Sequence, residues 1–497
     1  MKGILVITSP HRSISGADVT VSSTTAGVNY VLTGTTTDGM FKMEDNDDSK
    51  KFELTLDGVS ITNSDGPAIN IQSGKRCYVV AQDGTYNNFA DGSSYASSDE
   101  DQKGTIFSEG QLCFSGQGHI KVDANVKAGI ASDDYILIRP NTNIYVNASE
   151  GNGIKSNDGL DIRGGVVNVE VSGTAAKGLS TDGNFTMSGG RVTAITTGGG
   201  EYDSDEKDVT ACAGVKADSV FTITGGELNV KSTGAGGKGI SCDQTANFNG
   251  GTVKAITTGK TYSYSNSLDS KAKGIKVDGN LVIADGNVMV KTTGGDGSEG
   301  IESEGTITIS GGTTEIYSYD DAMNSDGNLT IDGGYVYAFS TGNDALDANQ
   351  NVIINDGTVL AYGTTSPEVG IDANTESGYS LYINGGTVMA VGGGTTSPAS
   401  SSKQPSIIYG GSVDSGSTIA IVSSSSETVA SYVMGRSYSG SVVFLLSAPG
   451  LTKGSSYTLT VDGTTVGTVS SLASPYSSIG SATGGMGGGT GGMPGGR

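Results

Sequence analysis

A template of about 24 residues recurs along most of this chain, and this repetition constrains the fold more than any other feature. Two clear copies are KGLSTDGNFTMSGGRVTAITTG and DAMNSDGNLTIDGGYVYAFSTG. Successive copies begin 22 to 26 residues apart, or 35 to 37 where a segment is inserted. Each begins at a small anchor residue: Ala68, Thr105, Gly129, Gly153, Gly178, Gly214, Gly239, Gly274, Gly300, Ala322, Ala345 or Gly370.

Three rows of apolar residues keep a fixed distance from these anchors. The first row lies one residue after the anchor, as at Ile154 and Leu346, and the second lies seven residues after it, as at Phe185. The third lies fourteen residues after the anchor, as at Val192 and Val336. Asp-Gly and Gly-Gly pairs, which favour turns, separate the rows. Each copy therefore predicts three short strands.

Copies of this length leave no room for helices that would connect parallel strands of a flat sheet. The sequence instead predicts an all-β parallel β-helix of about 24 residues per turn, in which the apolar rows stack inside the coil at the ~4.8 Å spacing of neighbouring strands. The leucine-rich pattern L-x-x-L-x-L-x-x-N is absent, and calcium-binding nonapeptide repeats have a different period.

The repeat also defines the expected domains. Residues 26–394 should form the parallel β-helix, after an N-terminal segment or cap at residues 1–25. Residues 395–475 depart from the template and alternate like a small antiparallel β unit, which could cap the open strand edges of the coil. Residues 476–497 are rich in Gly and Met and are expected to form a flexible tail.

The formal charge of −23 argues against nucleic acid or an anionic membrane as a partner and favours cation binding. No stretch is apolar enough to insert into a membrane, and the five-residue apolar run near the N-terminus is too short for a signal peptide. Four irregularly spaced cysteines form neither a zinc pattern nor a disulfide framework.

Several stretches carry a resemblance to a known family: YVLTGTTTDG, FELTLDGVSITNSDGPAINI, GTYNNFADG, GIASDD, GNGIKSNDGLDIRGG and KGISCD. They resemble a bacterial carbohydrate-binding domain family whose relatives are cellulose- and pectate-binding β-helix proteins of bacteria that degrade plant cell walls. The resemblance covers roughly residues 15 to 470. It implies a right-handed coil like that of pectate lyases, bound calcium, a secreted or cell-surface location and polysaccharide binding that does not require catalysis.

Carboxylates dominate the C-terminal turns. From Thr292 to Ser402 there are fifteen Asp and Glu residues and no Lys or Arg. Stacked carboxylates repel one another by ~3 kcal/mol at an effective dielectric of 20, so they need protons, water or a cation. Because hard oxygen ligands favour calcium, we expect a calcium site among residues near the anchors: Glu299, Glu302, Asp320, Asp321, Asp344, Asp347 and Asp372. A solvated acidic face is the alternative.

Aromatic residues collect on the same turns. If Val336 and Val359 point inward, strand alternation predicts an outward aromatic patch of Tyr317, Tyr335, Tyr337, Phe339 and Tyr362. Such a patch suits stacking on sugar rings. The alternative is that residues 395–475 cover it.

Catalytic signatures are sparse, with only two histidines, His11 and His119. We therefore expect non-catalytic, calcium-dependent binding of plant-type polysaccharide, either cellulose or pectate, at a bacterial cell surface. One alternative is a structural adhesin or surface scaffold. Another is a calcium-dependent pectate-lyase-like enzyme, in which Lys273, Lys276 or Lys291 would act as the base.

Overall fold

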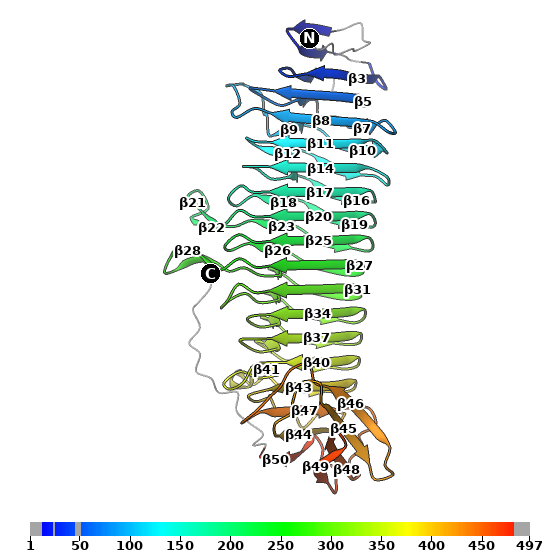
Figure 1. Cartoon of the computed structure of the whole chain (residues 1–497), viewed down its shortest axis with the longest axis vertical. Helices are drawn as coiled ribbons and strands as arrows, with labels where there is room; N and C mark the ends of the chain where they lie inside the picture. Colours follow the sequence, from blue (N-terminus) through cyan, green and yellow to red (C-terminus); the bar gives the residue numbers. More distant parts are fainter. Residues whose placement is uncertain (1–11, 23–24, 45–50, 482–497) are drawn as a thin grey trace. The chain divides into compact units, whose positions relative to one another are not determined.

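The computed structural model describes residues 12–22, 25–44 and 51–481. It divides into two compact units, Met1–Lys276 and Val277–Arg497. Both consist of strands wound into successive turns, about 15 turns of ~25 residues in all (Figure 1). The predicted all-β parallel β-helix is confirmed. The division between the units does not coincide with any boundary expected from the sequence.

In the first unit the turns build three columns of parallel strands, here called faces 1, 2 and 3. Face 1 contains β2 (Asp18–Ser22), β4 (Phe41–Glu44), β6 (Ile69–Gln72), β9 (Gly104–Ser108), β12 (Ala128–Ser132), β15 (Ile154–Ser156), β18 (Lys177–Thr181), β23 (Ala213–Ala217) and β26 (Lys238–Cys242). Face 2 contains β7 (Cys77–Ala81), β10 (Leu112–Gly116), β13 (Tyr135–Ile138), β16 (Gly159–Ile162), β19 (Asn184–Met187) and β24 (Phe221–Ile223). Face 3 contains β8 (Tyr86–Asp91), β11 (His119–Ala124), β14 (Asn143–Ala148), β17 (Val166–Val171), β20 (Arg191–Thr196) and β25 (Glu227–Ser232).

Two long strands of the first unit, β5 (Phe52–Asn63) and β27 (Ala246–Thr257), contribute to both face 2 and face 3. At the N-terminal end, β1 (Arg12–Ser15) pairs with β2, and β3 (Asn29–Thr36) pairs with β5. Because β2 already pairs in parallel with β4, the coil begins within the segment that the sequence predicted as a cap. Two inserted hairpins leave the coil, β21 (Glu201–Asp203) with β22 (Asp208–Thr210), and β28 (Tyr262–Ser265) with β29 (Leu268–Ser270).

The second unit repeats this plan. Its face 1 contains β32 (Ile301–Ser303), β35 (Met323–Ser325), β38 (Leu346–Ala348) and β41 (Ile371–Ala373). The first part of β31 (Leu281–Thr292) starts face 2, followed by β33 (Ile307–Ile309), β36 (Leu329–Ile331), β39 (Val352–Ile354) and β42 (Leu381–Ile383). The rest of β31 starts face 3, followed by β34 (Thr313–Ser318), β37 (Tyr335–Ser340), β40 (Thr358–Tyr362) and β43 (Thr387–Gly392). The short strand β30 (Ile275–Val277) spans the division, and a 3-10 turn, η1, covers Thr375–Ser377.

The predicted apolar rows are the stacked ladders of the interior. Ile301, Met323, Leu346 and Ile371 pair in sequence through face 1, and all four are fully buried. Burial alternates along the strands of face 3, with Val336 and Ala338 inside. The register predicted from the repeat is therefore correct.

The anchors are small because their side chains would point into the coil. A Cβ added to Gly153 would lie 2.1 Å from Cγ1 of Val169 and 2.6 Å from the carbonyl oxygen of Gly178. One added to Gly300 would lie 2.2 Å from Cγ2 of Ile316. Such contacts are far inside van der Waals distance, so the corner accepts a larger residue only if the turn moves.

The C-terminal residues end the coil of the second unit. Strand β47 (Val443–Ser447) pairs antiparallel with β43 and with β44 (Ser406–Gly410), and β50 (Tyr476–Gly480) pairs with β44. A four-stranded antiparallel sheet follows the order β46 (Thr428–Val433), β45 (Thr418–Ser423), β48 (Tyr457–Val461) and β49 (Thr464–Val469). The tail expected from residue 476 instead opens with a strand, and residues 482–497 lie outside the described part of the chain.

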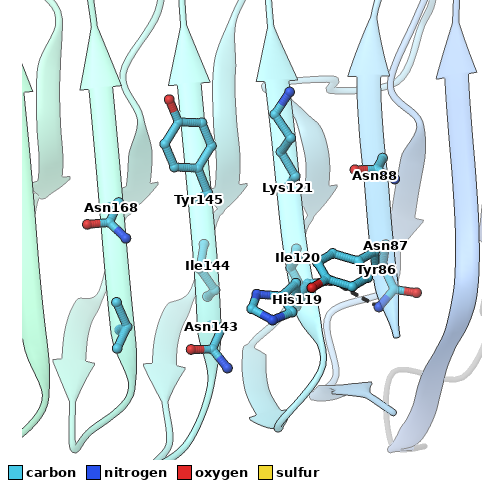
Figure 2. A pocket seen from close by; sticks show the side chains of 11 residues that line it. Tyr86, Asn87, Asn88, His119, Ile120, Lys121, Asn143, Ile144, Tyr145 and Asn168 are labelled. Atoms are coloured by element: carbon cyan, nitrogen blue, oxygen red, sulfur yellow. Dashed lines mark hydrogen bonds between the residues drawn. The ribbon is translucent and has the colours of Figure 1, made fainter. Parts of the chain in front are cut away.

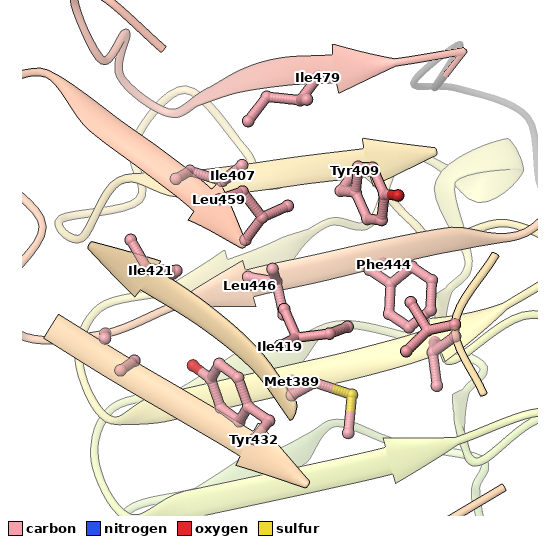
Figure 3. Close-up of a cluster of buried hydrophobic side chains, with 14 of the residues drawn as sticks. Met389, Ile407, Tyr409, Ile419, Ile421, Tyr432, Phe444, Leu446, Leu459 and Ile479 are labelled. Atoms are coloured by element: carbon pink, nitrogen blue, oxygen red, sulfur yellow. The ribbon is translucent and has the colours of Figure 1, made fainter. Parts of the chain in front are cut away.

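A large apolar cluster joins this C-terminal sheet to the last turns of the coil (Figure 3). Met389 of the last coil strand packs there with Ile419, Tyr432 and Phe444, all buried. The Tyr432 hydroxyl donates hydrogen bonds of 3.1 Å to the carbonyl oxygens of Val388 and Ser447. Strand β47 pairs with β43 and so closes the final strand edge of the coil, which would otherwise remain open to pairing with another chain.

Candidate functional site

An aspartate triad lies on face 1 of the second unit. Asp347 of β38 and Asp372 of β41 are direct partners in the strand ladder, and Asp344 lies in the turn that leads into β38. Ligand oxygens from Asp344, Asp347 and Asp372 all lie within 4.8 Å of one another. Asp344 is buried, whereas the other two are half-buried.

Backbone N–H groups of the next turn orient these carboxylates. Asp344 Oδ1 accepts a hydrogen bond from the N–H of Val369. One turn earlier, Asp321 Oδ1 accepts a hydrogen bond of 3.0 Å from the N–H of Asp344. Asp372 Oδ1 accepts a hydrogen bond of 3.2 Å from the hydroxyl of Thr396. Hydrogen bonds therefore orient the carboxylates of Asp344 and Asp372 within the triad.

Burial and mutual repulsion raise the pKa values in this region. The carboxyl pKa values of Asp321 and Asp344 lie well above the usual range, mainly because both groups are removed from water. Repulsion from Asp347 raises both pKa values further. Removal from water, then Asp372 and Glu299, raise the pKa of Asp347 to about 7. Carboxyl groups with raised pKa values bind protons or a cation in preference to remaining as bare anions.

Lysines pair with carboxylates near face 1 of the first unit, where Nζ of Lys103 lies 2.8 Å from the carboxylate of Asp133 and Nζ of Lys155 lies 3.2 Å from that of Asp182. Within the described ranges, no ion pair involves any member of the aspartate triad. The triad therefore lacks the compensation that the first unit provides with lysine.

The donor set fits calcium. Calcium binds six to eight oxygens at 2.3 to 2.6 Å, so two ligands of one ion can be up to about 5 Å apart. The triad satisfies this limit and offers only carboxylate oxygens, which suit calcium better than zinc or copper.

Three of the seven predicted ligands come together in the triad, and four do not. Asp320 accepts hydrogen bonds from the N–H of Gly297 and, over 2.6 Å, from the Asn343 amide, so its carboxylate links two turns. Glu302 is in the same ladder as Asp347, but Asn324 stands between them and interrupts the column of carboxylates. Asp321 and Glu299 lie on the preceding turns, and both are buried.

The predicted aromatic patch exists on face 3 of the second unit. Tyr317 of β34 and Tyr362 of β40 share one ladder row with Phe339 between them. Tyr337 of β37 lies diagonally to both, with its ring centroid 5.3 Å from each. Phe339 stacks parallel to Tyr337 at 6.3 Å, and Tyr335 lies on the same strand.

Part of this patch is covered by the C-terminal segment. Tyr362 is only 1% exposed; its hydroxyl donates a 3.2 Å hydrogen bond to the Val433 carbonyl and accepts one from the N–H of Gly435. The Arg436 guanidinium lies 5.5 Å above the Phe339 ring. The prediction that Tyr362 belongs to a free surface is therefore wrong, because a segment distant in sequence packs over this residue. Tyr317, at 39% exposure, is the most open member.

A second aromatic surface, not predicted from the sequence, lies on face 3 of the first unit (Figure 2). Tyr86 and His119 stack there at the edge of a shallow groove. The sequence did contain a signal, because exposed and buried positions alternate in the same way along β8 and β11. The side chains of Tyr86 and His119 therefore both face outward. The other histidine, His11, lies outside the described residues.

The lysines considered as lyase bases do not join the triad. Lys291 is exposed on β31 in face 3, whereas the triad is on face 1 of the same unit. Lys273 and Lys276 belong to the first unit.

No helix in the described part of the chain is long and apolar enough to span a membrane.

Comparison with solved structures gives a match of low structural similarity. The structure titled "Structure of the polysaccharide lyase-like protein from C. thermocellum, Gadolinium derivative" matches with a TM-score of 0.33 and 20% identity. The match covers 62% of this chain and 97% of that chain.

Comparison of sequences gives the family. A curated relative from Acetivibrio thermocellus, named "Carbohydrate-binding domain-containing protein", is 32% identical over 144 residues, which are 29% of this chain and 42% of the relative. The chain thus spans less than half of that relative. The family model described by the same name matches residues 15–184, 171–263 and 235–342, which together exceed half of the chain. This protein therefore belongs to the family of carbohydrate-binding domain-containing proteins.

Proposed function

We propose that this protein binds plant-type polysaccharide, cellulose or pectate, without catalysis, and that calcium held by the aspartate triad supports this binding. Family membership supports the carbohydrate. The observation that carries the calcium dependence is the convergence of Asp344, Asp347 and Asp372 within 4.8 Å, in a stretch of sequence without Lys or Arg.

The residues of the chain have distinct roles in this proposal. Asp347 and Asp372 belong to consecutive strands of face 1, so an ion that binds both would hold the two turns together. Asp344 is oriented by the N–H of Val369 and adds a third oxygen. Bound calcium would supply positive charge where this stretch has no basic side chain, which favours contact with the carboxylate of a uronate sugar.

Sugar stacking is assigned to the open part of the aromatic patch. Tyr317 is exposed and Tyr335 is half-buried on face 3 of the second unit. Aromatic faces of this kind bind the apolar faces of sugar rings, and an exposed group of them usually marks a contact surface. We place the protein outside the cell or at the bacterial surface, where calcium concentrations suit sites of modest affinity.

A non-catalytic role is favoured by the surroundings of the triad. A lyase would need a basic side chain near the calcium to remove the proton beside the uronate carboxylate. Lys291, the candidate base in the second unit, is on a different face from the triad.

The proposal is tested with an array of plant cell-wall glycans, probed with calcium and with a chelator. The same samples are assayed for unsaturated uronate products. We expect calcium-dependent retention of pectate without product formation. Retention of pectate that is as strong with chelator as with calcium would contradict the role of calcium. Accumulation of unsaturated uronate products would show that the protein is a lyase.

A further inference from the structure

A groove of about 400 Å³ crosses four neighbouring strands on face 3 of the first unit, namely β8, β11, β14 and β17 (Figure 2). Ile120 and Ile144 belong to the middle strands beneath the groove, and their side chains are buried. The groove is open to solvent, and the aspartate triad belongs to the other unit.

One wall of the groove is an aromatic platform. Tyr86 and His119 are direct partners in the ladder of β8 and β11, and their rings stack with centroids 4.6 Å apart and planes only 5° from parallel. Tyr86 is 68% exposed. Along the same row Val166 of β17 is 38% exposed. An exposed aromatic ring and an exposed aliphatic side chain in one row suit contact with the apolar face of a sugar ring.

The platform is fixed from below by Asn87, which is 1% exposed. Its Oδ1 accepts hydrogen bonds from the N–H groups of Gly58, over 3.0 Å, and Val59, over 3.1 Å. Its amide donates a 3.1 Å hydrogen bond to the His119 carbonyl oxygen. Binding groups on rigid strands lose little conformational entropy when a ligand is bound.

The other wall is polar. Asn88 of β8 and Asn168 of β17 lie on the outward row, and their side-chain amides make no hydrogen bond to any described residue. An amide offers both donors and an acceptor, which is the combination that sugar hydroxyl groups require. Tyr145 of β14 lies between them on the same row and is half-buried.

The charge of the groove indicates which sugars it suits. Among the residues that line the groove, Lys121 carries a permanent positive charge. Its ammonium group lies 2.7 Å from the carboxylate of Asp123. None of the described lining residues carries a carboxylate. A wall of aromatic rings and amides with a compensated lysine suits a neutral chain better than a polyuronate.

We propose that this groove binds a neutral β-1,4-linked polysaccharide, laid across the strands with one sugar ring against Tyr86, and without calcium. Such a chain is extended, presents flat apolar ring faces and carries hydroxyl groups at its edges. The rows flanking the groove advance from strand to strand at ~4.8 Å, so successive sugars meet successive strands. This inference rests on the carbohydrate-binding function proposed above but uses a separate site.

Calorimetry in chelator with cellohexaose, xylohexaose and mannohexaose tests the site. We expect at least one of these neutral chains to bind the full-length protein, and Tyr86→Ala to weaken that binding roughly tenfold. Tyr264→Ala is the matched control, because Tyr264 is 53% exposed and stacks on Tyr202 in the inserted hairpins. Failure of all three sugars to bind, or equal loss in both variants, would overturn the proposal.

The imidazole of His119 gives an independent measurement, because the chain has only two histidines. Its labelled ring signal is identified by its loss in His119→Ala. The bound neutral hexasaccharide should shift this signal, and trigalacturonate should not. An unmoved signal, or an equal shift with trigalacturonate, would overturn the assignment. Neither result depends on calcium. This test can therefore fail while calcium-dependent binding of pectate persists, and it can succeed where that binding is absent.

Discussion

The Asp321 carboxylate accepts a hydrogen bond of 3.0 Å from the backbone N–H of Asp344, one turn further along the coil. Asp344 repeats this contact with the N–H of Val369 on the following turn. Buried aspartates thus join consecutive turns of the second unit through the backbone. Each contact also brings a carboxyl group into a stretch of sequence without lysine or arginine, where it binds a proton or a cation more readily than it remains a bare anion.

Removing two carboxylates of the triad should remove most of the calcium effect on stability. Calcium bound by the triad as proposed should stabilise the folded coil and raise its melting temperature. In Asp344→Asn/Asp347→Asn this rise should be largely lost, as scanning calorimetry with calcium and with chelator would show. Asp326→Asn/Asp332→Asn is the control, because it removes the same charge from exposed positions of the same unit. An equal rise in the triad variant and the parent would leave the cluster as a solvated acidic face.

The raised pKa of Asp347, about 7, predicts a pH dependence in chelator. An aspartate in an unfolded chain has a pKa near 4. Between these values the folded protein retains a proton that the unfolded chain has released, so rising pH lowers the free energy of unfolding through this window. We expect the melting temperature to fall between about pH 4 and pH 7, and to fall less in Asp344→Asn/Asp347→Asn. Identical profiles for variant and parent would contradict this assignment.

Calcium should reverse that trend, because the ion requires deprotonated carboxylates. Its affinity for the parent protein is expected to increase with pH through the same window. Titration calorimetry at several pH values measures this directly.

The two parts of the aromatic patch should respond differently to truncation. Tyr362→Ala removes a buried ring and its hydrogen bonds to residues 433–435, so it should lower the free energy of unfolding by about 3 kcal/mol or more. Tyr317→Ala changes an exposed ring, so its stability effect should stay within about 0.5 kcal/mol. Denaturant unfolding measures both effects. If Tyr317→Ala also leaves glycan binding unchanged, the open part of the patch is not a sugar contact.

The interior ladder is tested by a pair of neighbours on β15. Ile154 is fully buried between Ile130 and Leu179, so Ile154→Ala should cost about 2 to 5 kcal/mol. Lys155 points outward and pairs with Asp182, and Lys155→Ala should cost less than about 1 kcal/mol. Similar losses from both changes in denaturant unfolding would show that the register is wrong.

The coil could be predicted from the sequence because its contacts are periodic. Ile301, Met323, Leu346 and Ile371 share one position in the template, and the fold stacks them without further information. The triad was partly predictable for the same reason. Asn324 interrupts the carboxylate column before Glu302, and reading the column residue by residue would have excluded that glutamate.

The parts that could not be predicted depend on contacts without a period. Strand alternation predicts that the side chain of Tyr362 points outward, as in a surface residue. However, Val433 and Gly435, more than seventy residues later in the sequence, pack over it. The stack of Tyr86 on His119 pairs two strands on either side of an insertion, where the template loses its regular spacing. Non-local packing of this kind leaves little trace in one sequence.

The most direct test of the central claim is the binding of polygalacturonate by the full-length protein with calcium and with chelator. We expect binding that requires calcium, that is lost in Asp344→Asn/Asp347→Asn and that is retained in Asp326→Asn/Asp332→Asn. Binding of equal strength in chelator, or in the triad variant with calcium present, would contradict the account.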